Sequence, residues 1–359
     1  MVWWPVHSWP PLTGGTEGGA GTALHKTFAM KKSNKIICGV GGIVFALLIL
    51  SILGGSIYML SFALYPVKNK GRDYAAQYRV MRQRYPWAVS WIDSVQRTKA
   101  LRDTFVVMKN EKTGLFLADS TRLHAFIIPA PKKDPRTVVL VPGYTDNAVD
   151  MLHFACFYNR ELGMNVLIPE LHANGKSGGE AMQMGWNDRN DVLRWAAIAD
   201  SLFRDSTGHA RIVIHGWSMG GATTMNVSGM DTPSYIKCFI EDCGYTSAWD
   251  EFSYELKDMF GLSDFPLLYT ASALCKIGLG WSFGEASPLK QIAKCHKPML
   301  LIHGGNDTFV PTRMIYPLYA AKPAPKLMVV FHGSKHAKSF KDHREEYSQY
   351  VKRFLERYL

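Results

Sequence analysis

Residues 211–221 read Arg-Ile-Val-Ile-His-Gly-Trp-Ser-Met-Gly-Gly and decide the fold that we expect. The run RIVIH is typical of a buried strand, and the small residues GATTMNVSG that follow favour a helix. A Gly-x-Ser-x-Gly motif between a strand and a helix forces its serine into a strained turn, from which the hydroxyl projects above the sheet. Gly216 and Gly220 remove Cβ atoms that would clash in so tight a turn. We therefore predict that Ser218 is a nucleophile.

The strand before Ser218 is one of six short apolar runs rich in valine, isoleucine and leucine. These runs are TVVLVPG, NVLIPE, RIVIHGWS, YIKCFIED, PMLLIHGG and KLMVVFHG. Longer amphipathic stretches separate them, and we expect helices over 187–206 and 342–358. This alternation predicts an α/β fold with a mostly parallel, doubly wound sheet over residues 104–359.

One interval between two expected strands, residues 246–286, is too long for a simple crossover. It is rich in large apolar residues, namely Trp249, Phe252, Met259, Phe260, Phe265, Leu267, Leu268 and Trp281. An insertion here lies above the carboxyl ends of the strands, where ligands bind in this kind of fold. We predict a mostly helical cap that supplies an acyl-binding wall, with the loop 171–186 as the alternative wall.

A serine hydroxyl is a weak nucleophile and needs a base that an acid orients. In this kind of fold the chain order is serine, then aspartate or glutamate, then histidine. The strand PMLLIHGG leads to Asp307, and KLMVVFHGSKHAKS carries His336 in the loop after the last strand. We predict these two as acid and base. Asp242, at the end of the preceding strand, and His332, at the end of the last one, stay open as rivals.

Acyl transfer also needs hydrogen-bond donors for the tetrahedral oxyanion, each of which contributes about 3–4 kcal/mol. The backbone N–H of Met219, next to the nucleophile, is one candidate. The second should come from the loop after TVVLVPG, and the N–H of Tyr144 is placed for it. Tyr144 is alternatively a packing residue, and its side chain could serve both purposes.

The stretches VPGYTDN, GWSMGG, EDCGYTSAWDEF, GGNDTFVP and GSKHAKS together resemble the α/β-hydrolase superfamily, and within it bacterial membrane-anchored hydrolases. The resemblance covers roughly residues 104–359. It implies the α/β-hydrolase fold, a Ser-Asp-His triad, carboxylic-ester chemistry and no cofactor. Many relatives begin the oxyanion loop with His-Gly, whereas this chain has Pro142-Gly143. His172 stands where a common Asp-x-Arg-Gly-x-Gly loop occurs, and we interpret it as structural.

An uncharged run extends from Ile36 to Tyr65. A membrane-spanning helix needs about 20 apolar residues, and this run is longer. A cleaved signal peptide has a shorter apolar core and a small-residue cleavage site, to which residues 61–63 are a poor match. We predict an uncleaved anchor over 36–65, preceded by a disordered or basic segment over 1–35.

Basic residues flank this run almost equally: Lys31, Lys32 and Lys35 precede it, and Lys68, Lys70 and Arg72 follow it. The Met-Lys-Lys sequence from Met30 favours a cytoplasmic N-terminus, with the catalytic domain on the periplasmic side. Residues 66–103 mix aromatic and basic side chains, and Pro86 divides them into two expected helices. These juxtamembrane helices either lie on the bilayer surface or pack on the catalytic domain.

The formal charge of +11 invites a nucleic-acid interpretation, but the basic residues form no long tract and no nucleic-acid module is visible. Anionic lipid headgroups beside the anchor are the simpler partner. The six cysteines form no CxxC pair. They are Cys38, Cys156, Cys238, Cys243, Cys275 and Cys295. We therefore expect no metal site, and we interpret them as small buried residues.

The sequence thus predicts a serine hydrolase that cleaves carboxylic esters. A peptidase or a thioesterase with the same triad is the nearest alternative, because the triad does not select the acyl substrate. A non-catalytic binding protein on the same fold is the alternative from another class.

Overall fold

The computed structural model describes residues 23–65, 73–110, 114–118 and 120–359. The compact unit that contains the sheet runs from Leu53 to Leu359. Its strands are β1 (Arg102–Lys109), β2 (Ser120–Ile128), β3 (Arg136–Val141), β4 (Asn165–Pro169), β5 (Arg211–Trp217), β6 (Ile236–Asp242), β7 (Met299–Gly304) and β8 (Lys326–Phe331).

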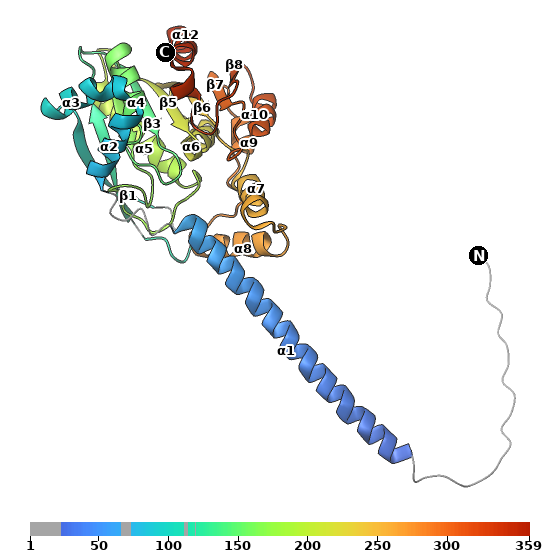
Figure 1. The fold of residues 1–359 in the computed structure, drawn as a ribbon. Coiled ribbons are helices and arrows are strands. Elements are labelled where there is room, and N and C mark those ends of the chain that lie inside the picture. The colour runs from blue at the N-terminus through green and yellow to red at the C-terminus, as the bar shows by residue number, and fades with distance from the viewer. Residues whose placement is uncertain (1–22, 66–72, 111–113, 119) are drawn as a thin grey trace, which may run out of the picture. The chain divides into compact units, whose positions relative to one another are not determined.

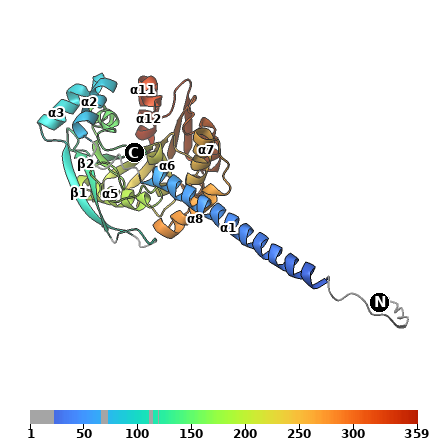
Figure 2. The same cartoon turned by 60° about the horizontal axis from the view of Figure 1, so that its bottom comes forward.

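These strands form one sheet in the order β1-β2-β4-β3-β5-β6-β7-β8 (Figure 1). All neighbours from β4 to β8 pair in parallel, whereas β1 pairs with β2, and β2 with β4, antiparallel. The predicted α/β-hydrolase fold with a mostly parallel sheet is confirmed. The antiparallel pair at the edge of the sheet, labelled in Figure 2, was not expected from the sequence.

Helices cover both faces of the sheet and form two separate apolar cores. One core contains side chains of α5 (Asp188–Phe203), α6 (Met219–Ser228), α9 (Pro288–Ile292) and α10 (Ile315–Ala321). The other contains side chains of α2 (Tyr74–Arg84), α3 (Val89–Arg97), α4 (Leu152–Cys156), α11 (Ser339–Asp342) and α12 (Arg344–Tyr358). The described residues also contain three short helical segments: η2 (Pro86–Ala88), η3 (Phe157–Glu161) and η4 (Thr312–Met314).

The two expected juxtamembrane helices are α2 and α3, with Pro86 at the break between them. The sequence left open whether these helices lie on the bilayer surface or pack on the catalytic domain. The structure shows that α3 packs on the catalytic domain. Trp91, Ile92 and Val95 are buried in the same core as the sheet, and the Trp91 indole donates a 3.1 Å hydrogen bond to Asn159. Residues 66–72 lie outside the described residues.

The cap consists of two helices, α7 (Ala248–Phe260) and α8 (Leu267–Leu279). The hydroxyl of Ser247 accepts a 3.0 Å hydrogen bond from the N–H of Asp250 and so begins α7. Gly261 and Gly280 end the two helices in the left-handed conformation, which costs a glycine no steric strain. The predicted helical cap is confirmed.

Helix α1 extends from Ala23 to Leu64, so it begins ahead of the uncharged run at Ile36. Its segment Val40–Leu64 is, among the described residues, the one helical stretch long and apolar enough to cross a membrane. This helix fits membrane anchoring. Its C-terminal turns belong to the same compact unit as the sheet: Leu64 is fully buried, and its carbonyl accepts a 2.8 Å hydrogen bond from the N–H of Met182.

Candidate active site

The turn between β5 and α6 holds Ser218 in a strained backbone conformation, with φ 54° and ψ −125°. The two flanking glycines allow the turn to be so tight. A Cβ atom on Gly216 would lie 2.0 Å from the carbonyl oxygen of Gly220, and one on Gly220 would lie 2.0 Å from that of Val141. The N–H of Ser218 donates a 2.7 Å hydrogen bond to the carbonyl of Asp242. These contacts fix the serine at the carboxyl ends of the central strands.

The structure brings Ser218, His336 and Asp307 together in one hydrogen-bonded row. His336 Nε2 lies 2.9 Å from Ser218 Oγ, and His336 Nδ1 lies 2.8 Å from Asp307 Oδ2. The other oxygen of Asp307 accepts hydrogen bonds of 3.0 Å from the N–H groups of Phe309 and Val310. The buried carboxylate is thus held in place, and it orients the imidazole toward the serine.

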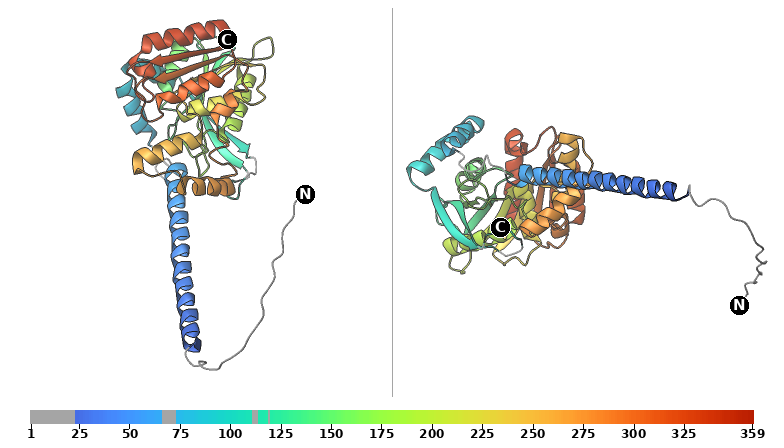
Figure 3. Two further views of the ribbon diagram at one scale, coloured as in Figure 1. Left: turned by 90° about the vertical axis from the view of Figure 1, so that its right-hand side faces the viewer. Right: turned by 90° about the horizontal axis from the view of Figure 1, so that it is seen from below.

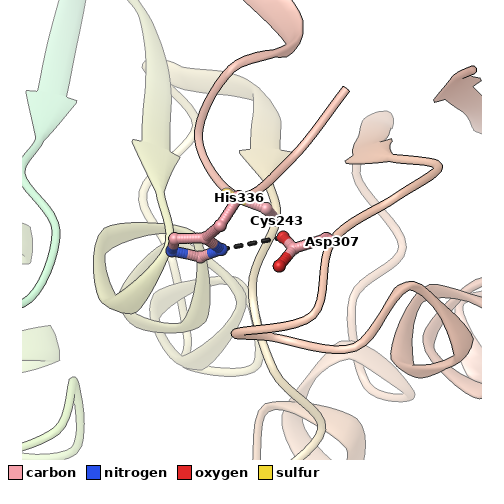
Figure 4. Close-up of side chains that lie close together, drawn as sticks. All are labelled: Cys243, Asp307 and His336. Atoms are coloured by element: carbon pink, nitrogen blue, oxygen red, sulfur yellow. Dashed lines mark hydrogen bonds and ion pairs between the residues drawn. The ribbon is translucent and has the colours of Figure 1, made fainter. Parts of the chain in front are cut away.

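Cys243 lies beside this row (Figure 4). Its sulfur and the nearest atoms of Asp307 and His336 all lie within 4.8 Å of one another, a spacing that could hold a metal ion. Both nitrogens of His336 already have hydrogen-bond partners, in Asp307 and Ser218. Burial raises the pKa of the Cys243 thiol well above its usual range, and a protonated thiol is a poor metal ligand. We therefore assign the group to the serine site.

The two rival residues lie outside the row. Asp242 is buried at the end of β6, and its Oδ2 accepts a 3.0 Å hydrogen bond from the hydroxyl of Tyr347. Burial raises its pKa to about 6. His332 is exposed in the turn after β8. Its carbonyl oxygen lies 3.1 Å from His343 Nε2, within hydrogen-bond distance.

The loop after β3 carries Tyr144 to the rim of the same site. The indole N–H of Trp217, the neighbour of Ser218, donates a 2.9 Å hydrogen bond to Asp146 in this loop. The Tyr144 hydroxyl donates a 2.8 Å hydrogen bond to the carbonyl of Ala63 at the end of α1. These two hydrogen bonds hold the predicted oxyanion loop in place, although it begins with Pro142-Gly143 and not with His-Gly.

An apolar pocket of about 250 Å³ lies above Ser218. The cap contributes apolar side chains to its wall: Phe252, Leu256, Met259, Phe260, Leu268, Ala271 and Phe283. The last turns of α1 contribute a second wall: Tyr58, Met59, Leu60, Phe62 and Ala63. Met219 and Tyr144 also line the pocket. Phe265, expected in the cap wall, is 73% exposed and is not among the lining residues.

Two acids on α7, Glu251 and Glu255, face the same pocket. Glu251 is buried, and its Oε2 has no hydrogen-bond partner among the described residues. Burial raises the pKa of Glu251 well above its usual range and also raises that of Glu255. The sequence did not reveal this pair, nor the contribution of α1, because a charge pattern does not show which face of a cap helix is inward.

A family model described as the prolyl oligopeptidase family matches residues 153–359, which is more than half of the chain. The chain belongs to the prolyl oligopeptidase family. The uncharacterised protein YqkD of Bacillus subtilis is 30% identical over 245 residues, covering 65% of this chain and 79% of that protein.

Two solved structures show the same fold. The Pyrococcus furiosus esterase Pf2001 superimposes with a TM-score of 0.56 at 20% identity, covering 73% of this chain and 93% of the esterase. The acylaminoacyl peptidase of Pyrococcus horikoshii superimposes with a TM-score of 0.51 at 18% identity, covering 72% of this chain and 41% of the peptidase. This prolyl oligopeptidase family member is therefore an α/β-hydrolase, and it is a serine hydrolase.

Proposed function

We propose that the chain cleaves carboxylic esters with apolar acyl groups through an acyl-enzyme intermediate. One observation carries this proposal: the hydroxyl of Ser218, bonded to His336, faces a pocket whose wall is mostly apolar, with Glu251 and Glu255 as its acidic side chains. Such a wall matches a hydrocarbon chain whose carbonyl carbon reaches the serine. A peptide substrate would present several backbone polar groups to the same wall, and burying those that Glu251 and Glu255 do not reach costs free energy.

In the proposed reaction Ser218 Oγ attacks the ester carbonyl carbon while His336 Nε2 takes the hydroxyl proton. Asp307 stabilises the resulting imidazolium. The carbonyl oxygen, now negative, faces the backbone N–H groups of Met219 and Tyr144. Collapse of the intermediate expels the alcohol, which receives the proton from His336. Water then attacks the acyl group by the same path, releasing the acid and restoring the serine.

A peptidase is the second candidate, because the matching family is named for a peptidase. The discriminating experiment compares p-nitrophenyl esters from acetyl to dodecanoyl, acyl-thioesters and peptide p-nitroanilides as substrates of the full-length protein in detergent. Ester cleavage predicts the highest kcat/KM on a medium-chain ester. Faster turnover of a peptide anilide would replace the esterase proposal by the peptidase one.

The same panel tests whether the cap sets the chain-length preference. Phe260 lines the pocket, whereas Phe265 on the same cap does not, so the two form a matched pair. Phe260→Ala should lower medium-chain turnover relative to acetyl turnover, because each bound methylene contributes about 1–3 kcal/mol to discrimination. Phe265→Ala should leave the ratio unchanged. Parallel losses on both esters in the Phe260 variant would exclude the cap as the specificity wall.

We also propose that α1 anchors the chain in a membrane with the catalytic domain on the periplasmic side. The uncharged helix and the Met-Lys-Lys sequence from Met30 support this placement. Protease added to spheroplasts should digest the catalytic domain. Digestion only after the membrane is permeabilised would place the domain in the cytoplasm.

A further inference from the structure

The pocket above Ser218 has its exposed rim between α1 and α7. Tyr58 and Phe62 on α1 and Met259 and Phe260 on α7 line the pocket, and each is 44–61% exposed. The rings of Phe62 and Phe260 meet edge to face, with centroids 6.2 Å apart. A hydrocarbon chain attached at Ser218 therefore has a continuous apolar path to the surface of α1.

With α1 as a membrane anchor, the turn of α1 just before this rim lies within the bilayer. A membrane-spanning helix places about 20 residues in the hydrocarbon, and every stretch of that length within the uncharged run from Ile36 to Tyr65 includes Gly55. The neighbouring Ser56 hydroxyl donates a 3.1 Å hydrogen bond to the carbonyl of Leu267, the first residue of α8. The N-terminal end of α8 thus contacts α1 at a level that the bilayer reaches, beside the C-terminal turns of α1 in both views of Figure 3.

The outward face of α8 carries one charged side chain, Lys276, which pairs with Glu285, and its other exposed side chains form an apolar stripe, which is unusual for a helix that faces water. Tyr269, Ala273 and Ile277 lie along one exposed stripe at intervals of four residues, while the opposite face packs into the core. Leu115 and Phe116 are 76% and 73% exposed, and their N–H groups donate hydrogen bonds to the last carbonyls of α8. We call the exposed side chains of residues 115, 116, 265, 269 and 277 the cap surface.

We propose that the cap surface lies in the boundary of the bilayer and that the pocket takes the acyl chain of a membrane lipid directly from the bilayer, along α1. The substrate class is then an acyl lipid that resides in the membrane, with its ester at Ser218. This inference rests on the proposed function, because it requires the nucleophile at that position. A small soluble ester has another route, since Phe309 also lines the pocket, is 46% exposed and has its ring 4.9 Å from that of His336.

The test uses the full-length protein in vesicles of phosphatidylcholine and phosphatidylglycerol. Two fluorophosphonate probes are compared, one with a long alkyl chain dissolved in the bilayer and one short and water-soluble. In the double variant Phe265→Ser with Ile277→Ser, both changes fall on exposed side chains outside the pocket lining. We expect labelling by the bilayer probe to slow by at least about tenfold, because two apolar side chains no longer enter the bilayer. Labelling by the soluble probe should stay within about twofold.

The matched control is Leu202→Ser with Leu327→Ser, two exposed apolar residues on α5 and β8. It should change neither rate. The inference is overturned if the cap variant leaves the bilayer-probe rate unchanged or lowers both rates together. Failure of both probes to label the native protein is a separate outcome, because it overturns the proposed function and with it the route of the substrate.

Discussion

The hydroxyl of Tyr144 donates a 2.8 Å hydrogen bond to the carbonyl oxygen of Ala63. The loop that carries a proposed oxyanion donor is thereby tied to the last turn of α1. Leu64, the next residue of the helix, is fully buried in the core of the catalytic unit. The end of the apolar helix is therefore a structural part of the active site and not a tether attached to it.

Tyr144→Phe should test this connection, because it removes the hydrogen bond and keeps the ring. We expect kcat to fall by about 5- to 10-fold, the effect of one hydrogen bond of roughly 1 kcal/mol that positions the loop. KM should change little. Tyr316→Phe is the control, since Tyr316 is exposed on α10 and does not line the pocket. Equal activity of the two variants would show that the loop keeps its geometry without the contact to α1.

His336→Ala should be as damaging as loss of the nucleophile, because residues of a triad act as a unit. His332→Ala should cost far less, since His332 is exposed and its side chain takes no part in the row of hydrogen bonds at Ser218. Steady-state turnover of one acyl ester by both variants measures the difference. An inactive His332 variant beside an active His336 variant would reverse our assignment of the base.

Asp307→Asn should preserve the fold and lower kcat by about 10⁴, because the imidazole then favours the wrong tautomer. The control is Asp242→Asn, which alters the rival acid at the end of β6. Its partner is the Tyr347 hydroxyl, and an asparagine oxygen can still accept that hydrogen bond. Loss of activity in the control with retention in the Asp307 variant contradicts the assignment.

The Asp242 variant should also change how stability depends on pH. Burial raises the pKa of Asp242 to about 6 in the folded protein, whereas an unfolded aspartate titrates near 3.9. Because the folded protein holds this proton more tightly than the unfolded chain does, protonated Asp242 stabilises the fold. This contribution to the free energy of unfolding is complete below about pH 4 and is lost as the pH rises through about 6. From pH 4 to pH 8 the free energy of unfolding of the native protein should therefore fall by about 2 kcal/mol relative to that of Asp242→Asn. Unfolding in detergent at the two pH values measures this, and a constant difference would contradict it.

The sequence was sufficient for the parts of the site that depend on local backbone geometry and chain order. Gly216 and Gly220 are required wherever a serine occupies so tight a turn, so the motif predicted the observed conformation of Ser218. The order of strands along the chain placed Asp307 and His336 after the carboxyl ends of neighbouring strands. Parallel strands bring their carboxyl ends together, which makes such side chains neighbours.

Long-range packing could not be predicted in the same way. An uncharged helix has the same composition whether Phe62 faces lipid or a pocket, so the contribution of α1 to the active site left no signal in the sequence. The apolar insertion predicted a cap, but not that Phe260 lines the pocket while Phe265 is exposed. The edge strand β1 was missed because it is mostly exposed and lacks a clear buried face.

The most direct test of the proposed reaction is covalent labelling of the full-length protein by a fluorophosphonate, with the modified residue identified by mass spectrometry. We predict that the label is on Ser218. Ser218→Ala should abolish labelling and lower ester turnover by about 10⁴- to 10⁶-fold, as expected for loss of a triad nucleophile. Labelling that persists in Ser218→Ala, or that maps to another residue of the native protein, would contradict the assignment of this serine as the nucleophile.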